Sequence, residues 1–143
     1  MQRTVRNLLA TKPPGLYTVN AEDPVRTAIQ LMADHHVGAL PVMRGPALAG
    51  IISERDYARK VVLMGRNSAE TPVWQIMSAP VVTVGPQHSV GHCMRLMTDR
   101  RIRHLPVVQD GALVGMVSIG DCVHALLEEQ REEIDELKRY IAS

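Results

Sequence analysis

Apolar and polar positions alternate along the chain in an order that predicts a strand followed by a helix. A short apolar run at residues 16–19 indicates a strand. Asp23 followed by Pro24 is typical of a helix start, with the aspartate as N-cap and the proline in the first turn. Apolar residues then recur every three or four positions, which predicts a helix that ends at Gly38.

Two more strands and a second helix complete the predicted unit. Apolar runs at 39–43 and 48–52 flank a Gly45–Pro46 turn, which indicates an antiparallel pair. Ser53 follows the last strand and is expected to cap the next helix, because its hydroxyl can accept a free backbone N–H. The predicted order is β-α-β-β-α.

The same order begins again 65 residues later. When residues 17–57 are laid over 82–122 without a gap, 14 of 41 positions are identical. The second copy is predicted to contain a strand at 81–84, a helix at 90–97, strands at 104–108 and 113–117, and a helix capped by Ser118. Residues 5–9 also resemble 73–77. We expect an α/β (α+β) fold with pseudo-two-fold symmetry: an N-terminal segment packing on the pair (1–15), repeat 1 (16–66), a linker (67–80), repeat 2 (81–127) and a C-terminal helical extension (128–143).

Pro41 and Pro106 fall inside predicted strands at equivalent positions. Because proline has no N–H to donate to a sheet, these strands are expected to lie at an edge or to present that side elsewhere.

Composition narrows the class of protein. The chain has 143 residues, a formal net charge of +1 and 45% hydrophobic residues. These values are typical of a folded domain, and they offer neither the basic surface that nucleic acids select nor an apolar run long enough for a membrane span. Cys93 and Cys122 are expected to be reduced core thiols of a cytoplasmic protein. His88 and His92 lack neighbours that would complete a metal site, so no metal is expected, and no catalytic motif is present.

Two matched motifs resemble a known family. Leu40-Pro-Val42 precedes Gly50-Ile-Ile-Ser-Glu-Arg-Asp56, and Leu105-Pro-Val107 precedes Gly115-Met-Val-Ser-Ile-Gly-Asp121. The chain thereby resembles a tandem pair of cystathionine-β-synthase (CBS) domains from about residue 5 to 127. The resemblance implies sites for adenine nucleotides in clefts between the repeats, and a disc-shaped homodimer.

The residues themselves suit a nucleotide. In each copy a serine at a helix start precedes an aspartate by three positions, as Ser53 precedes Asp56 and Ser118 precedes Asp121. The carboxylate can accept hydrogen bonds from a ribose diol, and the free N–H groups at the helix start favour an anion. The alternative is that both pairs only cap their helices.

Phosphate contacts are expected to be unequal. The resemblance places Arg103 and His104 near the ligand held by Asp56, where Arg55 would join them, whereas Gly38 and Ala39 stand at the matching positions of the first copy. The expected adenine contacts are Thr18, Val37, Leu40, Pro41, Thr83, Ile102, Leu105 and Pro106.

We therefore expect a non-catalytic sensor that binds AMP, ADP, ATP or NAD and signals its occupancy to an unknown protein target. A ligand-free dimerisation scaffold is the alternative, and an enzyme acting on nucleotides has less support.

The final helix is predicted to continue to Ile141 with an apolar stripe. The stripe residues repeat at three- and four-residue intervals: Leu127, Gln130, Ile134, Leu137 and Ile141. Such a stripe can pack on its own body or on a dimer partner, and we favour the partner because an isolated amphipathic end would fray.

Overall fold

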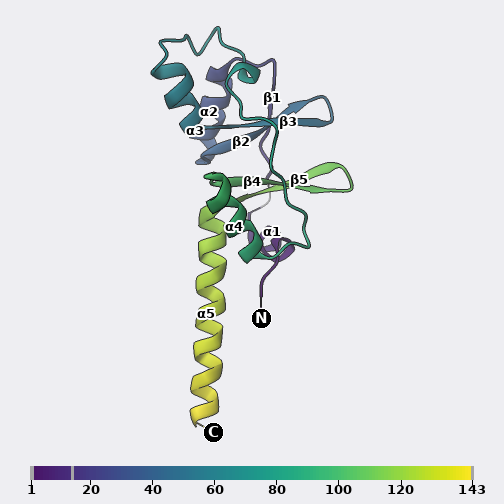
Figure 1. Cartoon of the computed structure of the whole chain (residues 1–143), viewed down its shortest axis with the longest axis vertical. Coiled ribbons are helices and arrows are strands. Elements are labelled where there is room, and N and C mark those ends of the chain that lie inside the picture. Colours follow the sequence, from purple (N-terminus) through teal and green to yellow (C-terminus); the bar gives the residue numbers. More distant parts are fainter. Residues whose placement is uncertain (1, 14, 143) are drawn as a thin grey trace. The chain divides into compact units, whose positions relative to one another are not determined.

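The computed structural model describes residues 2–13 and 15–142, and the chain divides into two compact units (Figure 1). The first-repeat unit is Gly15–Val82, and the second-repeat unit combines Met1–Pro14 with Thr83–Ser143. The expected α/β class with two β-α-β-β-α-like repeats is confirmed. Of the expected N-terminal segment (1–15), all but Gly15 belongs to the second-repeat unit. Residues 67–80, expected as a linker, belong to the first-repeat unit.

The first-repeat unit is built on a three-stranded sheet in the order β1-β2-β3. Strand β1 runs parallel to β2, and β2 runs antiparallel to β3. Its elements are β1 (Val19–Asn20), α2 (Val25–His35), β2 (Ala39–Arg44), β3 (Ala47–Ser53), α3 (Glu54–Tyr57), the π-helical turn η1 (Ala58–Val62) and the 3-10 turn η2 (Val73–Gln75). Leu40 and Ile52 from the sheet pack with Met32 of α2, and Val73 and Ile76 join the same buried cluster.

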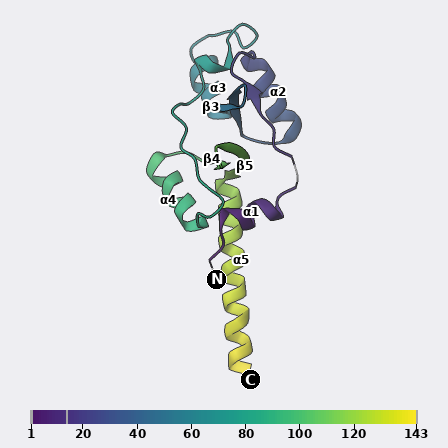
Figure 2. The same ribbon diagram turned by 90° about the vertical axis from the view of Figure 1, so that its right-hand side faces the viewer.

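The second-repeat unit has a smaller sheet in which β4 pairs antiparallel with β5. A single parallel bridge between Val84 and Val107 stands where β1 pairs with β2 in the other unit. Its elements are α1 (Val5–Thr11), α4 (Val90–Arg100), β4 (His104–Gln109), β5 (Ala112–Ser118) and α5 (Ile119–Ala142). Figure 2 shows α1 and α4 beside the N-terminal part of α5.

The ends of α2 differ from the prediction. Pro24, not Asp23, is the N-cap, and the Asp23 carboxylate instead accepts the backbone N–H of Asn20 at 3.1 Å. The helix ends at His36, which adopts a left-handed conformation with φ 53°, two residues before Gly38. Arg101 has the same conformation after α4, with φ 55°. Both helices therefore end at residues that have a side chain, whereas the sequence suggested a glycine stop for α2.

The first strand of each repeat is shorter than its apolar run predicts. Strand β1 covers Val19–Asn20 and not 16–19, and residues 81–84 contribute only the bridge at Val84. Leu16 and Tyr17 are 40% and 38% exposed, so apolar side chains at this position lie outside the sheet. The antiparallel strands β2–β3 and β4–β5 are each longer than predicted by one or two residues.

The two strand prolines are accommodated without an edge position in the first repeat. Strand β2, which contains Pro41, lies between β1 and β3, so the edge alternative is wrong there. Strand β1 pairs only with the two residues after Pro41, and the missing N–H therefore interrupts no pairing with β1. In the other unit, the carbonyl of Pro106 accepts the Val84 N–H at 3.1 Å. The second alternative is therefore the correct one: the side of the strand that lacks the proline N–H makes few sheet hydrogen bonds.

Two glycines allow one helical segment to lie directly against each sheet. A Cβ built on Gly50 would lie 2.6 Å from the Met77 sulfur, and one built on Gly115 would lie 2.7 Å from a Leu9 methyl carbon. Leu9 and Met77 are the equivalent residues of the segments 5–9 and 73–77, whose similarity the sequence showed. The two segments therefore pack in the same way, each against the sheet of its own unit.

Helix α5 is the longest element and contacts its unit through one face. Cys122 and Ala125 on that face are buried, and Cys93 of α4 is buried against Cys122. Both thiols are free, as expected. A hydrogen bond with Cys93 and, after it, burial raise the pKa of Cys122, so this group stays a thiol at neutral pH. Within the described residues, no helix combines the length and the apolar character needed to cross a bilayer.

Candidate functional site

The first site centres on Asp56, at the junction of β3 and α3. The Ser53 hydroxyl accepts the Asp56 N–H at 3.1 Å, and Asp56 Oδ2 accepts the backbone N–H and the hydroxyl of Ser53, both at 3.0 Å. This reciprocal pair is a capping box. The other carboxylate oxygen, Oδ1, lies 3.3 Å from the Ser78 hydroxyl and 3.2 Å from the Lys60 ammonium. The carboxylate is only 12% exposed and is fixed by four donors.

The second site has the same arrangement around Asp121, where β5 meets α5. Asp121 Oδ2 accepts the Ser118 N–H at 2.9 Å, and the Ser118 hydroxyl accepts the Asp121 N–H at 3.1 Å. The Lys12 ammonium lies 2.8 Å from the same carboxylate oxygen and also 2.8 Å from the carbonyl of Met116. Burial alone would raise the pKa of Asp121, but hydrogen bonds from Lys12 and Ser118 outweigh it and lower the pKa.

Each aspartate therefore has one lysine partner, and the two lysines come from different places in the chain. Lys60 lies one helical turn after Asp56, so its spacing was visible in the sequence. Lys12 lies 109 positions before Asp121, and no local pattern connects the two residues. Sequence reasoning missed both lysines and so underestimated the positive charge beside Asp121.

The geometry shows that both aspartates cap their helices, which was the simpler of the two alternatives. Capping does not use up a carboxylate, because its two oxygens together have about four acceptor positions. A ribose diol could therefore share Asp56 or Asp121 with the cap. A phosphate could pair with the lysine that now neutralises the carboxylate.

His104 lies beside the second site. It is directly opposite Ser118 in the β4–β5 pairing, and the carbonyl of Arg103 accepts the N–H of Ile119 at 2.8 Å. Burial lowers the pKa of His104, and the charges of Lys12 and Arg103 lower it further against the opposing effect of Asp121. The lowered pKa therefore favours the neutral form of His104 at pH 7.

Ala39 and Gly38 occupy the matching positions in the first-repeat unit. Ala39 is opposite Ser53, and the carbonyl of Gly38 accepts the N–H of Glu54 at 3.0 Å. Gly38 and Ala39 therefore have the same backbone positions as Arg103 and His104, and the two copies differ there in their basic side chains. Arg55 is exposed on α3. The expected approach of Arg103 and His104 to Asp56 and Arg55 stays a prediction, since the two pairs belong to different units.

The expected adenine contacts differ in accessibility. Four of them are buried in strands β2 and β4: Leu40, Pro41, Leu105 and Pro106. Thr18 and Thr83 are exposed, each just before the first strand of its repeat. Val37 and Ile102 are half-buried, after α2 and α4 respectively. The buried four shape the sheet rather than offer a free surface. Val37 lines an open groove in the first-repeat unit.

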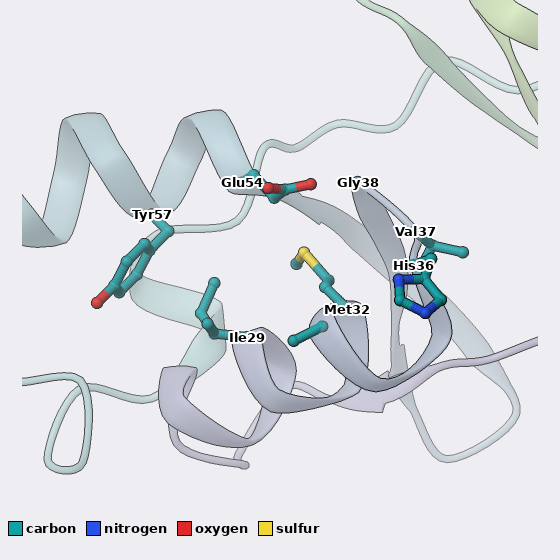
Figure 3. A pocket seen from close by; sticks show the side chains of 8 residues that line it. Ile29, Met32, His36, Val37, Gly38, Glu54 and Tyr57 are labelled. Carbon is teal, nitrogen blue, oxygen red and sulfur yellow. The ribbon is translucent and has the colours of Figure 1, made fainter.

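This groove has a volume of about 530 Å³ and lies between α2 and α3. Tyr57 and His36 stand near opposite ends, and Met32 and Glu54 lie between them (Figure 3). Glu54 and Tyr57 flank Asp56 in α3, so the groove adjoins the turn that carries the first site. The sequence pattern assigned the groove residues of α2 to the core, because a periodic apolar face does not show which part of it is covered.

His88 and His92 contact each other through stacked rings with centroids 4.5 Å apart. The His88 Nδ1 atom accepts the N–H of Gly85 at 2.8 Å, which fixes the loop before α4. Among the described residues, no three metal-binding side chains gather in one place.

Comparison with known proteins agrees with this arrangement. The family model described as CBS domain matches residues 5–63 and 73–128. The chain is 49% identical over 125 residues to the CBS domain-containing protein CBSX3, mitochondrial, of Arabidopsis thaliana, covering 84% of this chain and 61% of that protein. It is 38% identical over 104 residues to YhcV of Bacillus subtilis, covering 73% and 74% of the two chains.

Solved structures agree as well. A protein with CBS domains from Burkholderia ambifaria superposes with a TM-score of 0.86 at 49% identity, covering 90% of this chain and 96% of that one. A CBS-domain protein from Agrobacterium tumefaciens gives 0.81 at 32% identity, covering 86% and 98%. With both repeats matched by the family model and with each Ser–Asp pair at its strand-to-helix junction, the chain belongs to the CBS domain family as a tandem pair.

Proposed function

We propose that this protein is a regulatory module that binds adenine nucleotides through the Asp56 and Asp121 sites. CBS domains are in general regulatory, ligand-binding modules. The observation that carries the proposal is the repeated arrangement of a serine-capped aspartate with a lysine ammonium within 3.2 Å at Asp56 and 2.8 Å at Asp121. An acceptor for a ribose diol and a cation for a phosphate thus stand side by side in each unit.

The ligand we propose is AMP, ADP, ATP or NAD, all of which contain adenosine. The two sites are not equivalent, because Lys60 lies in η1, directly after the helix that carries Asp56, whereas Lys12 comes from a distant segment. We expect the site around Asp56 to bind phosphate more strongly, with Arg55, Arg103 and His104 contributing. The module would signal by binding its ligand more tightly in one conformation than in another, so that occupancy shifts the population seen by a protein target.

Isothermal titration calorimetry with AMP, ATP and NAD tests the proposal. Asp56→Asn and Asp121→Asn keep an acceptor for the cap but remove the charge that orients the diol and the lysine. Each is expected to weaken binding at its own site by roughly tenfold or more, about 1.4 kcal/mol. Asp110→Asn is the matched control, since Asp110 lies in the exposed β4–β5 turn at φ 53°, where asparagine is well tolerated.

Thermal melts of the same variants separate a lost contact from a lost fold. Unchanged nucleotide affinity in both site variants, with all melts intact, would contradict the assignment of the aspartates. Absence of binding by the unmodified protein would favour the alternative function, a ligand-free dimerisation scaffold.

Assembly and location are part of the same proposal. We propose a homodimer. A CBS-CP12 protein from bloom-forming cyanobacteria, 26% identical with a TM-score of 0.78, is described as hexameric. We also propose a cytoplasmic location, although the relative CBSX3 is named as a mitochondrial protein.

A further inference from the structure

Helix α5 is held by its own unit along one face only. Cys122 and Ala125 on this inner face are buried. One turn further along, the Glu129 carboxylate accepts the backbone N–H of Arg3, and the Arg3 guanidinium lies 2.6 Å from a Glu132 carboxylate oxygen. These contacts fix the N-terminal half of α5, and the remainder extends past α1 and α4 of the same unit (Figure 2).

The opposite face carries an exposed apolar stripe, which we call the outer stripe. It consists of Val123, Leu127, Gln130, Ile134, Leu137 and Ile141. Leu127 and Leu137 are each 59% exposed, and Ile134 is 53% exposed. At about 100° per residue, the outer stripe lies roughly 140° around the helix from the inner face. The unit therefore cannot cover the stripe with the contacts that hold α5 in place.

The spacing of the outer stripe is that of a coiled-coil seam. Its members alternate at intervals of four and three residues, so Leu127, Ile134 and Ile141 take the a positions of successive heptads. Gln130 and Leu137 take d positions. Isoleucine at a with leucine at d favours two parallel strands, and one polar residue in the seam fixes the register. We propose that the outer stripes of two copies of this chain pair as a parallel, in-register, two-stranded coiled coil.

Charges beside the stripe select the parallel orientation. Glu133 occupies a g position and Lys138 the following e position. In a parallel pair the g residue of one helix meets the next e residue of the other, so Glu133 faces the opposite charge of the second copy's Lys138, twice by symmetry. An antiparallel pair sets e against e and g against g. It would then bring Arg131 against Lys138, or Arg131 and Glu133 against their own copies, all of like charge.

A seam of fewer than three heptads is short for a coiled coil, but α5 does not form it from an unfolded start. The inner-face contacts already hold the first turns of the helix, so the cost of helix nucleation falls on folding of the unit and not on pairing. Gln130 is expected to reduce the strength of the seam while excluding shifted registers. The pairing does not depend on nucleotide binding; it rests on the homodimer proposed above and names the surface that would join the two copies.

Charge reversal tests the orientation. Lys138→Glu would place two like charges on each side of a parallel seam, and the dimer dissociation constant is expected to rise by roughly tenfold at low salt. Glu133→Lys should have the same effect, and the double variant should return to within about twofold of the unmodified protein, since it restores opposite charges. Asp135→Lys is the control because position 135 lies outside the seam and its flanks. Sedimentation equilibrium measures all four.

An unchanged or smaller dissociation constant for Lys138→Glu would overturn the proposal, because an antiparallel seam gains or keeps stability from this change. Disulfide trapping gives an independent measurement where the dimer is too tight to titrate. Leu137→Cys should form a cross-linked dimer on mild oxidation, since a d residue meets its own copy in a parallel seam, whereas Asp135→Cys should not. The native thiols of Cys93 and Cys122 are fully buried, so they are not expected to form cross-links between copies. Failure of Leu137→Cys to cross-link beyond the Asp135→Cys control would likewise overturn the proposal.

Discussion

Gly50 and Gly115 occupy equivalent positions in β3 and β5, yet an alanine at each should have a different effect on stability. At Gly115 the three atoms nearest to the added Cβ all belong to the Leu9 side chain, at 2.7, 3.0 and 3.4 Å. That side chain can rotate away. At Gly50 the Cβ would contact the Met77 side chain at 2.6 and 2.9 Å and also the Ser78 carbonyl at 3.0 Å. The backbone of Ser78 is paired with Ile51 by two hydrogen bonds, of 2.8 and 3.1 Å, and cannot shift without weakening them.

These contacts set the expected magnitudes. Overpacking of a core costs about 1–3 kcal/mol, and we expect the lower end for Gly115→Ala and the upper end for Gly50→Ala. Alanine also restricts the unfolded chain, which returns about 0.4–1 kcal/mol in both variants. The net loss of unfolding free energy should therefore be about 2 kcal/mol for Gly50→Ala, whereas Gly115→Ala should stay within about 1 kcal/mol of the unmodified protein.

Urea denaturation at a fixed protein concentration measures both values, since any dimer makes stability depend on concentration. The two variants serve as controls for each other, because each makes the same chemical change at a matched place in the sheet. The Gly50 variant should also weaken nucleotide binding at the first site, because the Ser78 hydroxyl contacts Asp56. Equal losses in the two variants, or a smaller loss for Gly50→Ala, would refute the view that the backbone contact decides the cost.

Two further predictions concern the second site. Lys12→Met should raise the pKa of Asp121, because burial then acts without its opposing ammonium. The lowered native pKa contributes stability at neutral pH that is lost as pH falls through it, so the variant should be less stable at neutral pH and should lose less stability on acidification. Carbon NMR titration of the carboxyl group measures this, and an unchanged pKa would show that Lys12 is not its partner in solution. Since partial burial holds the pKa of His104 below its ordinary value of 6.5, the unfolding free energy should fall as pH drops from 7 through that value, and His104→Gln should flatten the fall. A pH profile that is the same in both proteins would argue against a half-buried, neutral His104.

Much of the fold follows from local patterns in the sequence. The repeat is visible because each copy preserves the same alternation of apolar runs and the same Ser–Asp pair, and a capping box depends on residues three positions apart. The length of α5 and its stripe also follow from helical periodicity. Strand ends were less predictable, since β1 is as long as its pairing with β2 and not as long as its apolar run.

The lysine partners of the two aspartates also differ in whether a local sequence pattern predicts them. Lys60 is one helical turn from Asp56, so the sequence by itself determined that contact once the helix formed. Lys12 reaches Asp121 only because Leu9 packs on Gly115 and carries its segment across β5, and no local signal encodes that approach. The sequence by itself thus determined the repeats, the two Ser–Asp caps and the outer stripe, which depend on neighbours along the chain. Only the tertiary structure decided the pKa of Asp121, the partial burial of His104 and the unequal cost of the two glycines, because these depend on atoms that folding brings together from distant positions.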